Sequence, residues 1–392
     1  MLIKQVHECQ EGKRDLKISR QDQEDSVWLL LGARGGDNAQ VRAIASHLDL
    51  LKIEKPLSYN VLHIFPNLLK GASLGSLRAR LHPEIQPPWP RMVIAVGKRS
   101  VPVARYIKQQ SGGATRLVHL GRPRANLESF DLVLTTPQYG LLAAEQVMEL
   151  FVPPSALSNL DVVKALEAGA QFRTEKSQPY IVVIVGGNNT TATLSDTAVR
   201  NLVQSTQQRT TDTGGSLFVL TSPRTPKAAV EVLRNELNSK ATLVEWGQPV
   251  KDTANPYSAL LAMADEVIVT SDSASMIADG LALNKPVKIF QLPKGWQGAL
   301  TMGISSLFMN LDHVSRRKGG MILLLAPWRI LRKYGLINPP RNMALLINHL
   351  FENGLAQPFP PPEKGLPKRA INPVIPTSIE HAITRIKSLL KR

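Results

Sequence analysis

Two unbroken apolar runs, each ending in glycines, dominate the hydrophobic pattern of this chain. Val27–Leu31 leads into the glycine-rich segment Gly32–Asn38, and Tyr180–Val185 leads into Gly186–Thr191. An apolar run without alternation is typical of a parallel strand that is buried on both faces. Glycines followed by small polar residues are typical of a turn that starts a helix, where the backbone can approach a ligand and the helix N-terminus attracts an anion. The pattern therefore predicts one strand-turn-helix unit in each half of the chain, although a tight turn without any ligand has the same appearance.

Further apolar runs alternate with helical stretches in both halves, which predicts an α/β protein with two parallel sheets covered by helices. The other predicted strands are Leu57–Ile64, Arg91–Gly97, Thr115–Leu120, Leu132–Thr135, Leu217–Thr221, Thr242–Trp246, Glu266–Thr270 and Val287–Phe290. The expected division is a polar leader (1–25), an N-terminal domain (26–150), a crossover (151–179), a C-terminal domain (180–300), a basic amphipathic region (301–351), a proline-rich linker (352–375) and a C-terminal helix (376–392). The final helix is expected to bury Ile379, Ala382, Ile383, Ile386 and Leu390.

Composition narrows the class of protein. Apolar residues at 43% and charged residues at 20% indicate a globular chain, and 392 residues suffice for two domains. The single cysteine, Cys9, excludes internal disulfides and fits a reducing cytoplasm. We therefore expect a cytoplasmic protein.

The net charge of +16 is concentrated in two segments. Residues 66–124 contain eleven Lys or Arg against one acid, and residues 311–341 contain seven against one. Nucleic acid is not the expected partner, because aromatic residues are only 5% and no nucleic-acid motif occurs. Met321–Leu331 sets leucines and Trp328 beside arginines, as in segments that lie at a membrane interface. This predicts peripheral association with an anionic membrane, with a core helix that has a basic end as the equal alternative.

The residues 26–300 resemble bacterial relatives of the plant mitochondrial-fission "elongated mitochondria" family, which are regarded as glycosyltransferases of the two-Rossmann-domain GT-B fold. The resemblance rests on Gly-Gly-Asp-Asn-Ala-Gln (35–40), Val-Gly-Gly (185–187), Thr-Ser-Asp-Ser-Ala-Ser-Met (270–276) and Asn-Lys-Pro-Val (284–287). It implies a GT-B-like fold with two Rossmann-like domains facing a cleft, the first on the acceptor side and the second on the donor side. The chain is also similar to lipopolysaccharide heptosyltransferases, in which a Gly-Asp pair ends the first loop. That comparison assigns Asp37 to activation of the acceptor.

The chemistry of glycosyl transfer selects the candidate site residues. Asp37 is the predicted general base, because a sugar hydroxyl needs a carboxylate or histidine to take its proton. Its alternative role is to cap a helix that begins at Asn38, and His63 and His119 are alternative bases. The predicted acceptor-binding residues are Gly35, Gly36, Asn38, Lys98 and Arg99. The predicted nucleotide-binding residues are Gly186, Gly187, Asn188, Trp246, Ser271, Asp272, Ser273, Ala274, Ser275, Met276 and Asp279.

Several of these residues have a structural role as the alternative to ligand binding. In that alternative, Asp279 lies on a solvated helix face, Trp246 packs in the core, and Lys98 and Arg99 belong to a general basic surface. The proline in Asn255-Pro256-Tyr257 indicates a helix start with a structural role. No Asp-x-Asp motif occurs, so no metal site and no cofactor are expected, the nucleotide-sugar being a co-substrate.

The sequence therefore favours a glycosyltransferase that uses a nucleotide-sugar donor and a membrane-associated, lipid-linked acceptor on the inner face of a membrane. The alternative is a non-enzymatic adaptor with a glycosyltransferase-like body, as the role of the plant relatives in mitochondrial fission implies. A nucleotide-sugar epimerase would need more acids and histidines in the cleft than the sequence offers.

Overall fold

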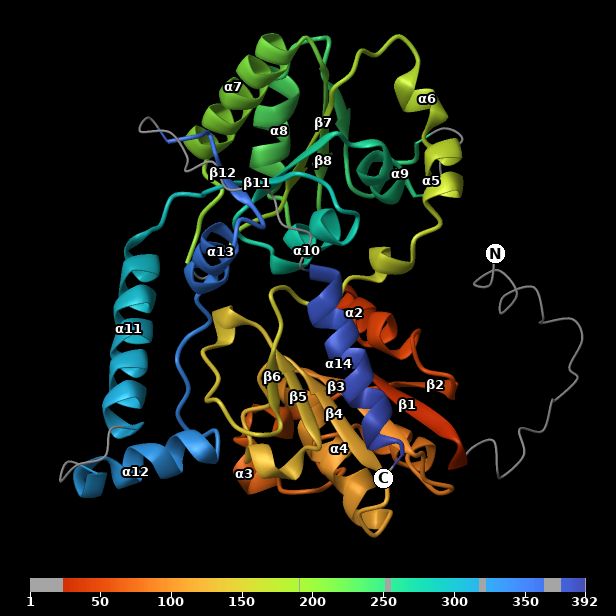
Figure 1. Cartoon of the computed structure of the whole chain (residues 1–392), viewed down its shortest axis with the longest axis vertical. Helices are drawn as coiled ribbons and strands as arrows, with labels where there is room; N and C mark the ends of the chain where they lie inside the picture. The colour runs from red at the N-terminus through yellow and green to blue at the C-terminus, as the bar shows by residue number, and fades with distance from the viewer. Residues whose placement is uncertain (1–23, 190, 251–254, 317–321, 363–374, 392) are drawn as a thin grey trace, which may run out of the picture.

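The computed structural model describes residues 24–189, 191–250, 255–316, 322–362 and 375–391. Over these residues the strands form two six-stranded sheets, and each neighbouring pair is parallel (Figure 1). The first sheet has the order β2-β1-β3-β4-β5-β6, with β1 Ser26–Leu31, β2 Leu51–Pro56, β3 Met92–Val96, β4 Arg116–Leu120, β5 Leu132–Thr135 and β6 Val147–Glu149. The second has the order β12-β11-β10-β7-β8-β9, with β7 Tyr180–Val185, β8 Ser216–Thr221, β9 Thr242–Val244, β10 Glu266–Thr270, β11 Val287–Phe290 and β12 Gln357–Phe359.

The helices follow the strands in both domains. They are α2 Gly35–Ala45, α3 Asn67–Lys70, α4 Gly97–Gln110, α5 Val162–Ala168, α6 Ala170–Arg173, α7 Asp196–Thr213, α8 Lys227–Glu236, α9 Pro256–Met263, α10 Ala274–Ala282, α11 Trp296–Arg316, α12 Ile322–Lys333, α13 Met343–Glu352 and α14 Ile375–Leu389. Short 3-10 helices include η3 Val61–Ile64, η5 Leu127–Ser129, η6 Pro137–Tyr139 and η7 Ala156–Asn159.

Alternate residues of each central strand enter two different cores. In β1, Val27 and Leu29 face the core that includes residues of α2 and α14, while Trp28 and Leu30 face the core with α4. In β7, alternate residues likewise divide between a core with α7 and α8 and a core with α9, α10 and α13. Burial on both faces explains why the apolar runs are unbroken, and it confirms the predicted α/β fold with two parallel sheets.

The end of the chain returns to the first domain. α14 places Ala382 and Ile386 in the core beneath the first sheet, where both are fully buried, although the strand before it, β12, belongs to the second sheet. The sequence predicted the buried face of this helix correctly, but not the domain that it covers.

Several sequence predictions need correction. Leu57–Ile64 is not a strand, because β2 is Leu51–Pro56 and the later residues form a loop and η3. β2 is an edge strand with mostly exposed and charged residues, so it lacks an apolar run. The strand β12 lies inside the predicted proline-rich linker, and α13 belongs to the core of the second domain, so this domain extends beyond 300. Residues 1–23 of the predicted leader, with Cys9, lie outside the described residues.

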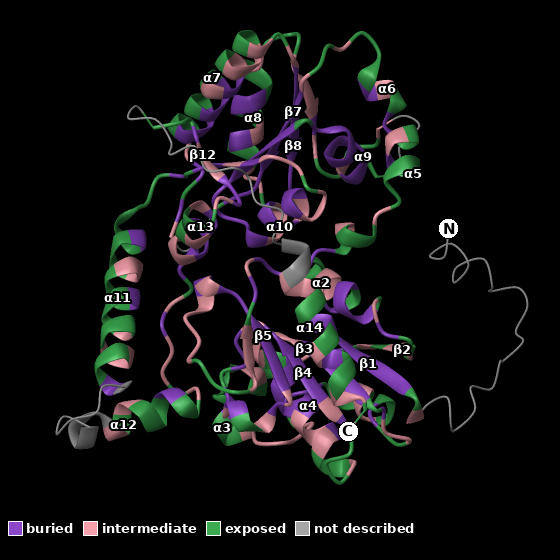
Figure 2. Cartoon of the chain, viewed as in Figure 1, coloured by how far each residue is buried: buried purple, intermediate pink, exposed green. Residues whose placement is uncertain are grey.

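Helices α11 and α12 extend along one side of the molecule, with outward faces that are largely exposed (Figure 2). Trp328 packs against α11 within the protein. Its indole N–H donates to Asp312 Oδ1 at 2.8 Å, and its ring centroid lies 4.7 Å from that of Phe308. Arg332 is buried and forms an ion pair with Asp312 at 2.8 Å. In the predicted membrane segment, Met321 and the side chains of residues 322–325 lie outside the described part of the chain. Within the described residues, no helix is long and apolar enough to cross a membrane.

Asp312 is expected to hold α12 against α11. Its replacement by alanine leaves the Arg332 guanidinium, whose side chain is 1% exposed, buried without its carboxylate. Breaking one side of a buried pair costs about 3 kcal/mol or more. We expect Asp312→Ala to speed hydrogen exchange of the α12 backbone amides by about tenfold or more, measured by mass spectrometry.

The matched control is Lys333→Ala, which removes the exposed ion pair between Lys333 and Glu128. Such a pair contributes little, so exchange in α12 should stay near the wild-type rate. Equal exchange in Asp312→Ala and Lys333→Ala would contradict the role of Asp312.

Candidate functional site

Both sheets reverse their strand order at one point, and the predicted turns lie at these two points. The order reverses between β1 and β3 in the first sheet and between β7 and β10 in the second. Open α/β sheets bind ligands outside the carboxyl ends of the strands at such a switch point. The loops and helix starts after these strands contain most of the predicted site residues, namely Gly35, Gly36, Asp37, Asn38, Lys98, Arg99, Gly186, Gly187, Asn188, Ser271, Asp272, Ser273, Ala274, Ser275 and Met276.

The two switch points meet at the boundary between the domains. A Cβ atom added to Gly36, in the first turn of α2, would lie 3.8 Å from Ser275 Oγ, in the first turn of α10. Neither helix has a side-chain cap. Two helix N-termini with uncapped N–H groups therefore face each other, and each favours an anion.

Asp37 lies in the first turn of α2 and is half-buried. The proposed capping role is wrong, because the helix begins earlier, at Gly35, and Asp37 forms no cap bond. Burial raises the pKa of the Asp37 carboxyl, while the charges of Arg34 and Arg341 act in the opposite direction. The loop is held instead by Asn38, whose side-chain amide exchanges two hydrogen bonds of 2.9 Å with the Gly32 backbone.

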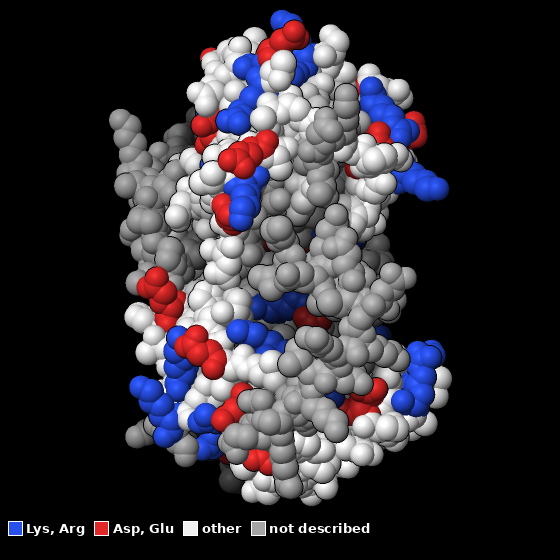
Figure 3. All heavy atoms as spheres, turned by 90° about the vertical axis from the view of Figure 1, so that its right-hand side faces the viewer, with Lys and Arg blue, Asp and Glu red and all other residues white. Residues whose placement is uncertain are grey.

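A group of arginines approaches this position, and the sequence did not single it out. Arg122 is buried and donates to the carbonyls of Tyr139 and Pro339. The guanidinium carbons of Arg122 and Arg341 lie 5.8 and 5.7 Å from the Tyr139 ring centroid. Burial first, and then the charges of Arg124, Arg332 and Arg341, lower the pKa of Arg122 to about 10. On the face shown in Figure 3, other Lys or Arg side chains are visible at the waist, where the two domains meet.

These arginines come from segments that are far apart in the sequence. Arg122 follows β4, whereas Arg341 comes from the segment before α13, which lies against η6 of the first domain. Neither forms an ion pair with a carboxylate of the described residues. The sequence signal was only a general basic excess, because no local motif marks residues that converge from two domains.

The glycines after β7 are explained by contacts within the protein. A Cβ atom on Gly186 would lie 2.2 Å from Asp272 Oδ1, and one on Gly187 would lie 2.1 Å from the Arg224 carbonyl oxygen. The Gly186 N–H donates to Thr270 Oγ1 at 2.8 Å, and the Gly187 N–H donates to Asp272 Oδ2 at 2.9 Å. These two N–H groups are therefore occupied, which corrects the expectation that Gly187 offers a free donor to a phosphate.

Asp272 is the centre of this network. Its side chain is completely buried, accepts a bond from Thr270 at 2.7 Å and forms an ion pair with Arg224 at 2.9 Å. Burial raises the pKa of Asp272, and the hydrogen bond from Gly187 is the largest opposing effect. Asp272 thus joins the loops after three strands, β7, β8 and β10.

Of the other predicted nucleotide-binding residues, some form hydrogen bonds within the protein and one is exposed. Asn188 accepts a bond from Leu194 N, and Ser271 Oγ accepts one from Leu292 N. Asp279 is not on a solvated face: it accepts bonds from Ser155 at 2.5 Å and from Tyr257 at 2.7 Å, and burial raises its pKa. Trp246 is 63% exposed, so the core-packing alternative for this residue is wrong.

Asn255 caps α9 by accepting a bond from Ser258 N, with Pro256 in the first turn. This confirms the structural role predicted for the Asn255-Pro256-Tyr257 segment.

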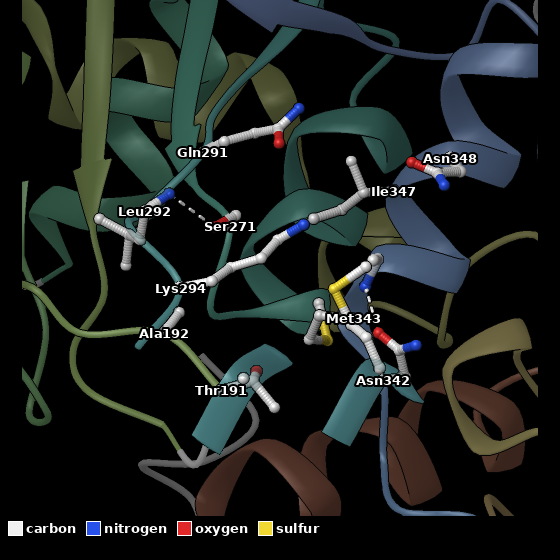
Figure 4. A pocket seen from close by; sticks show the side chains of 13 residues that line it. Thr191, Ala192, Ser271, Gln291, Leu292, Lys294, Asn342, Met343, Ile347 and Asn348 are labelled. Atoms are coloured by element: carbon white, nitrogen blue, oxygen red, sulfur yellow. Dashed lines mark hydrogen bonds between the residues drawn. The ribbon is translucent and has the colours of Figure 1, made fainter. Parts of the chain in front are cut away.

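A small cavity of about 90 Å³ lies at the carboxyl ends of β10 and β11, under α11 and α13 (Figure 4). Lys294 extends across it, and Ser271, Gln291 and Asn342 contribute polar groups. Its other lining residues are Thr191, Ala192, Leu292, Gly298, Met302, Met343, Ala344, Ile347 and Asn348. Its volume suits a phosphate-sized group rather than a complete nucleotide.

The two candidate histidines lie elsewhere. His119 is fully buried in β4 against Phe130, and burial lowers its pKa to about 3, so it stays neutral and out of reach of a substrate. His63 lies in η3, and its Nδ1 is 2.5 Å from the Asn60 carbonyl oxygen. Asp37 is therefore the best-placed base among the predicted residues.

Two Rossmann-like parallel sheets, with their switch points on one boundary, define an α/β protein of the GT-B-like class. The chain belongs to the mitochondrial fission ELM1 family, whose family model matches residues 35–307. It is 27% identical over 224 residues to the mitochondrial fission protein ELM1 of Arabidopsis thaliana, which covers 51% of this chain and 51% of that protein. It is 26% identical over 309 residues to the uncharacterized protein RP120 of Rickettsia prowazekii, which covers 68% of this chain and 84% of that protein. The resemblance found in the sequence motifs is confirmed.

The solved structures that match this chain are only distantly similar to it. UDP-GlcNAc 2-epimerase from Methanocaldococcus jannaschii has a TM-score of 0.45 and 11% identity, with 93% of this chain and 99% of that chain covered. Medicago truncatula UGT71G1 complexed with UDP-glucose has a TM-score of 0.41 and 9% identity, with 94% and 99% covered.

Proposed function

We propose that this chain is a glycosyltransferase that moves a sugar from a nucleotide-sugar donor to a membrane-associated acceptor. One observation carries the proposal: the uncapped N-termini of α2 and α10 face each other across the domain boundary, with the half-buried Asp37 on the first-domain side. A nucleotide-sugar needs this combination, because its diphosphate is an anion and its sugar must meet a base.

The second domain would hold the nucleotide. The diphosphate would accept bonds from the N–H groups at the start of α10, near Ser273, Ala274 and Ser275, because this end of the helix has no side-chain cap. Trp246 follows β9 at the same edge of the sheet, and its exposed ring is available to stack on a base.

The first domain would activate the acceptor. Asp37 would take the proton of an acceptor hydroxyl while the hydroxyl oxygen forms a bond to the anomeric carbon of the sugar. The bond from that carbon to the phosphate oxygen breaks, and the nucleoside diphosphate leaves. Arg34 and Arg341 keep Asp37 charged more readily than burial alone would allow. Lys98 and Arg99, at the start of α4, would bind an anionic group on the acceptor.

The arginine group would stabilise the leaving diphosphate, since neither Arg122 nor Arg341 forms an ion pair with a carboxylate in the described residues. The part of the chain that the structure describes contains no group of three His, Cys, Asp or Glu side chains that could hold a metal ion. We therefore expect turnover to persist after exhaustive treatment with a chelator. Complete loss of turnover that magnesium or manganese restores would show that the diphosphate is stabilised in another way.

A non-enzymatic adaptor remains the second candidate, and a specific observation favours it. In the turn after β7, the Gly187 N–H already donates to Asp272, and Asp272 forms an ion pair with Arg224. Asp279 accepts hydrogen bonds from Ser155 and Tyr257. A body that no longer binds nucleotides would keep such internal bonds. The Arabidopsis relative is named for mitochondrial fission, which also supports this alternative.

Calorimetry with uridine, adenosine, guanosine and cytidine diphosphates distinguishes the two candidates, with inorganic pyrophosphate as a control. A glycosyltransferase should bind at least one nucleotide more tightly than pyrophosphate. At 100 times the dissociation constant, that nucleotide should stabilise the folded chain by about 2.7 kcal/mol and raise its melting temperature. Binding of none of them would make the adaptor the leading candidate.

A further inference from the structure

The segment from η3 to α3 exposes a group of large apolar side chains. Their exposed fractions are Val61 75%, Leu62 44%, Ile64 70%, Phe65 54%, Leu68 47% and Leu69 74%. Three of them, Val61, Leu62 and Ile64, belong to the stretch Leu57–Ile64 that was predicted as a strand. Soluble monomers seldom expose so many neighbouring apolar groups unless the surface binds a partner or a membrane.

Polar contacts fix this segment with its apolar side chains outward. Asn67, the buried residue of α3, donates from Nδ2 to the carbonyls of Lys98 and Pro123, both at 2.9 Å. Asn60 caps η3 and donates to the carbonyls of Gly75 and Leu77. The exposed apolar face is therefore held in place by the protein, and it is not a loop that failed to reach the core.

Four cations border this face. Lys70 ends α3, Lys98 and Arg99 begin α4, and Arg124 follows β4. Burial lowers the pKa of Lys70, and the charges of Lys98 and Arg99 lower it further. Burial also lowers the pKa of Lys98, as do the charges of Arg124 and Arg99. None of the four forms an ion pair with an acid among the residues that the structure describes. The group is an excess of positive charge that a negatively charged surface would complement.

The turn after α12 packs beside Arg124, one of these four cations. A Cβ atom added to Gly335 would lie 2.5 Å from the backbone of Arg124 and of Ala125, so this turn packs directly on the loop after β4. Ile330 and Leu336 remain 55% and 41% exposed. Both α3 and the end of α12 lie on the same flank of the first domain, at the lower left of the view (Figure 1).

We propose that η3, α3 and the end of α12 form a docking face that seats the first domain on an anionic lipid bilayer. The apolar side chains enter the interface, and the four cations meet the lipid headgroups. This assignment moves the centre of membrane contact from Met321–Leu331 to the η3–α3 segment.

The docking face also specifies the acceptor, a part of the inference that rests on the proposed function. Lys98 and Arg99 belong both to the docking face and to the switch point of the first sheet. A lipid with an anionic headgroup would therefore reach the acceptor side of the cleft while its tail stays in the bilayer. An acceptor of this class has an apolar tail, an anionic head and a free hydroxyl.

Vesicle flotation of the full chain tests the docking face. Wild type should float with vesicles of phosphatidylcholine and phosphatidylglycerol about tenfold more strongly than with phosphatidylcholine alone, and high salt should reduce the difference. The double variant Ile64→Ser and Leu69→Ser should bind the anionic vesicles about tenfold more weakly or worse. Both side chains are at least 70% exposed, so the melting temperature should not change.

The matched control is Val162→Ser with Val163→Ser, which alters two apolar residues of α5 that are 42% and 66% exposed. This control should bind vesicles like wild type. The inference is overturned if wild type does not float, if both vesicle types bind it equally, or if the Ile64/Leu69 variant floats like wild type. It is also overturned if wild type is a dimer that the Ile64/Leu69 variant converts to a monomer without any vesicle binding, because a second copy would then cover the face.

Nucleotide titration of the same preparations separates this inference from the proposed function. Vesicle binding without nucleotide binding would support the docking face and contradict the proposed glycosyltransferase function. Nucleotide binding without vesicle binding would support a nucleotide-using enzyme and contradict the docking face.

Discussion

Replacement of Asp37 by asparagine should lower the rate of glycosyl transfer about 100-fold or more, because an amide cannot take the proton of the acceptor hydroxyl. The measurement is release of nucleoside diphosphate from the donor, with lipid extract as the source of acceptor. Asp49→Asn is the matched control, since that carboxylate is 99% exposed and follows α2. Turnover of Asp37→Asn at the wild-type rate would remove Asp37 from the mechanism.

The same variant should fold normally, and the difference in stability between wild type and this variant should depend on pH in a defined direction. The pKa of Asp37 is raised in the folded chain, so its ionised form is less favourable there than in the unfolded chain. Its contribution is fully present below the unfolded pKa and is lost as the pH rises through the raised folded pKa. At pH 7 the melting temperature of Asp37→Asn should therefore equal or exceed that of wild type, and the difference should shrink in acid. The acid limb of the wild-type rate should likewise lie above the ordinary aspartate value of 3.8.

A negative charge at the start of α10 should abolish nucleotide binding. Ser275→Asp places a carboxylate in the first turn, where the helix dipole favours it, so the fold should be retained. The carboxylate then occupies the position proposed for the diphosphate and repels it. We expect binding to weaken by about 100-fold or more in calorimetry, a change of about 2.7 kcal/mol. Ser273→Asp, at the N-cap of the same helix, should act in the same way.

Ser275→Asn is the isosteric control without charge, and it should bind the nucleotide within a few-fold of wild type. Equal weakening in both variants would mean that size, not charge, disturbs the site. Unchanged binding in Ser275→Asp would mean that the diphosphate lies elsewhere, and the cavity beside Lys294 would then be the next position to examine.

The sequence predicted the parts of the fold in which burial leaves a one-dimensional signal. Strands such as β7 and β10 are buried on both faces and must be apolar throughout. β2 and β12 carry no such signal, because one is a charged edge strand and the other has only three residues, with a proline at its centre. The exposed apolar residues of η3 led to the opposite error, a predicted strand where none exists, since a sequence does not distinguish apolar residues that face a core from those that face outward.

The site was predictable only where it follows a strand. The turns with Asp37 and Ser275 could be found because glycines and small polar residues mark the end of a buried strand. The sequence could not show that the protein itself fills the space beside Gly186 and Gly187. A glycine that permits close approach looks the same in the sequence whether the approaching atom belongs to a ligand or to Asp272. Arg122 and Arg341 were missed because only the folded chain brings them to one tyrosine ring.

The return of α14 to the first domain has a consequence for biosynthesis. The ribosome makes residues 24–150 first, yet Ala382 and Ile386 of α14 belong to the core of that domain. Domains usually fold as units during synthesis, from the N-terminal one onward. Here the second domain can fold first, while part of one apolar face of the earlier-made sheet stays uncovered until α14 has emerged. A nascent chain of this protein should therefore need protection by a chaperone for longer than the length of its first domain suggests, and a truncation before Ile375 should expose the first domain rather than the second.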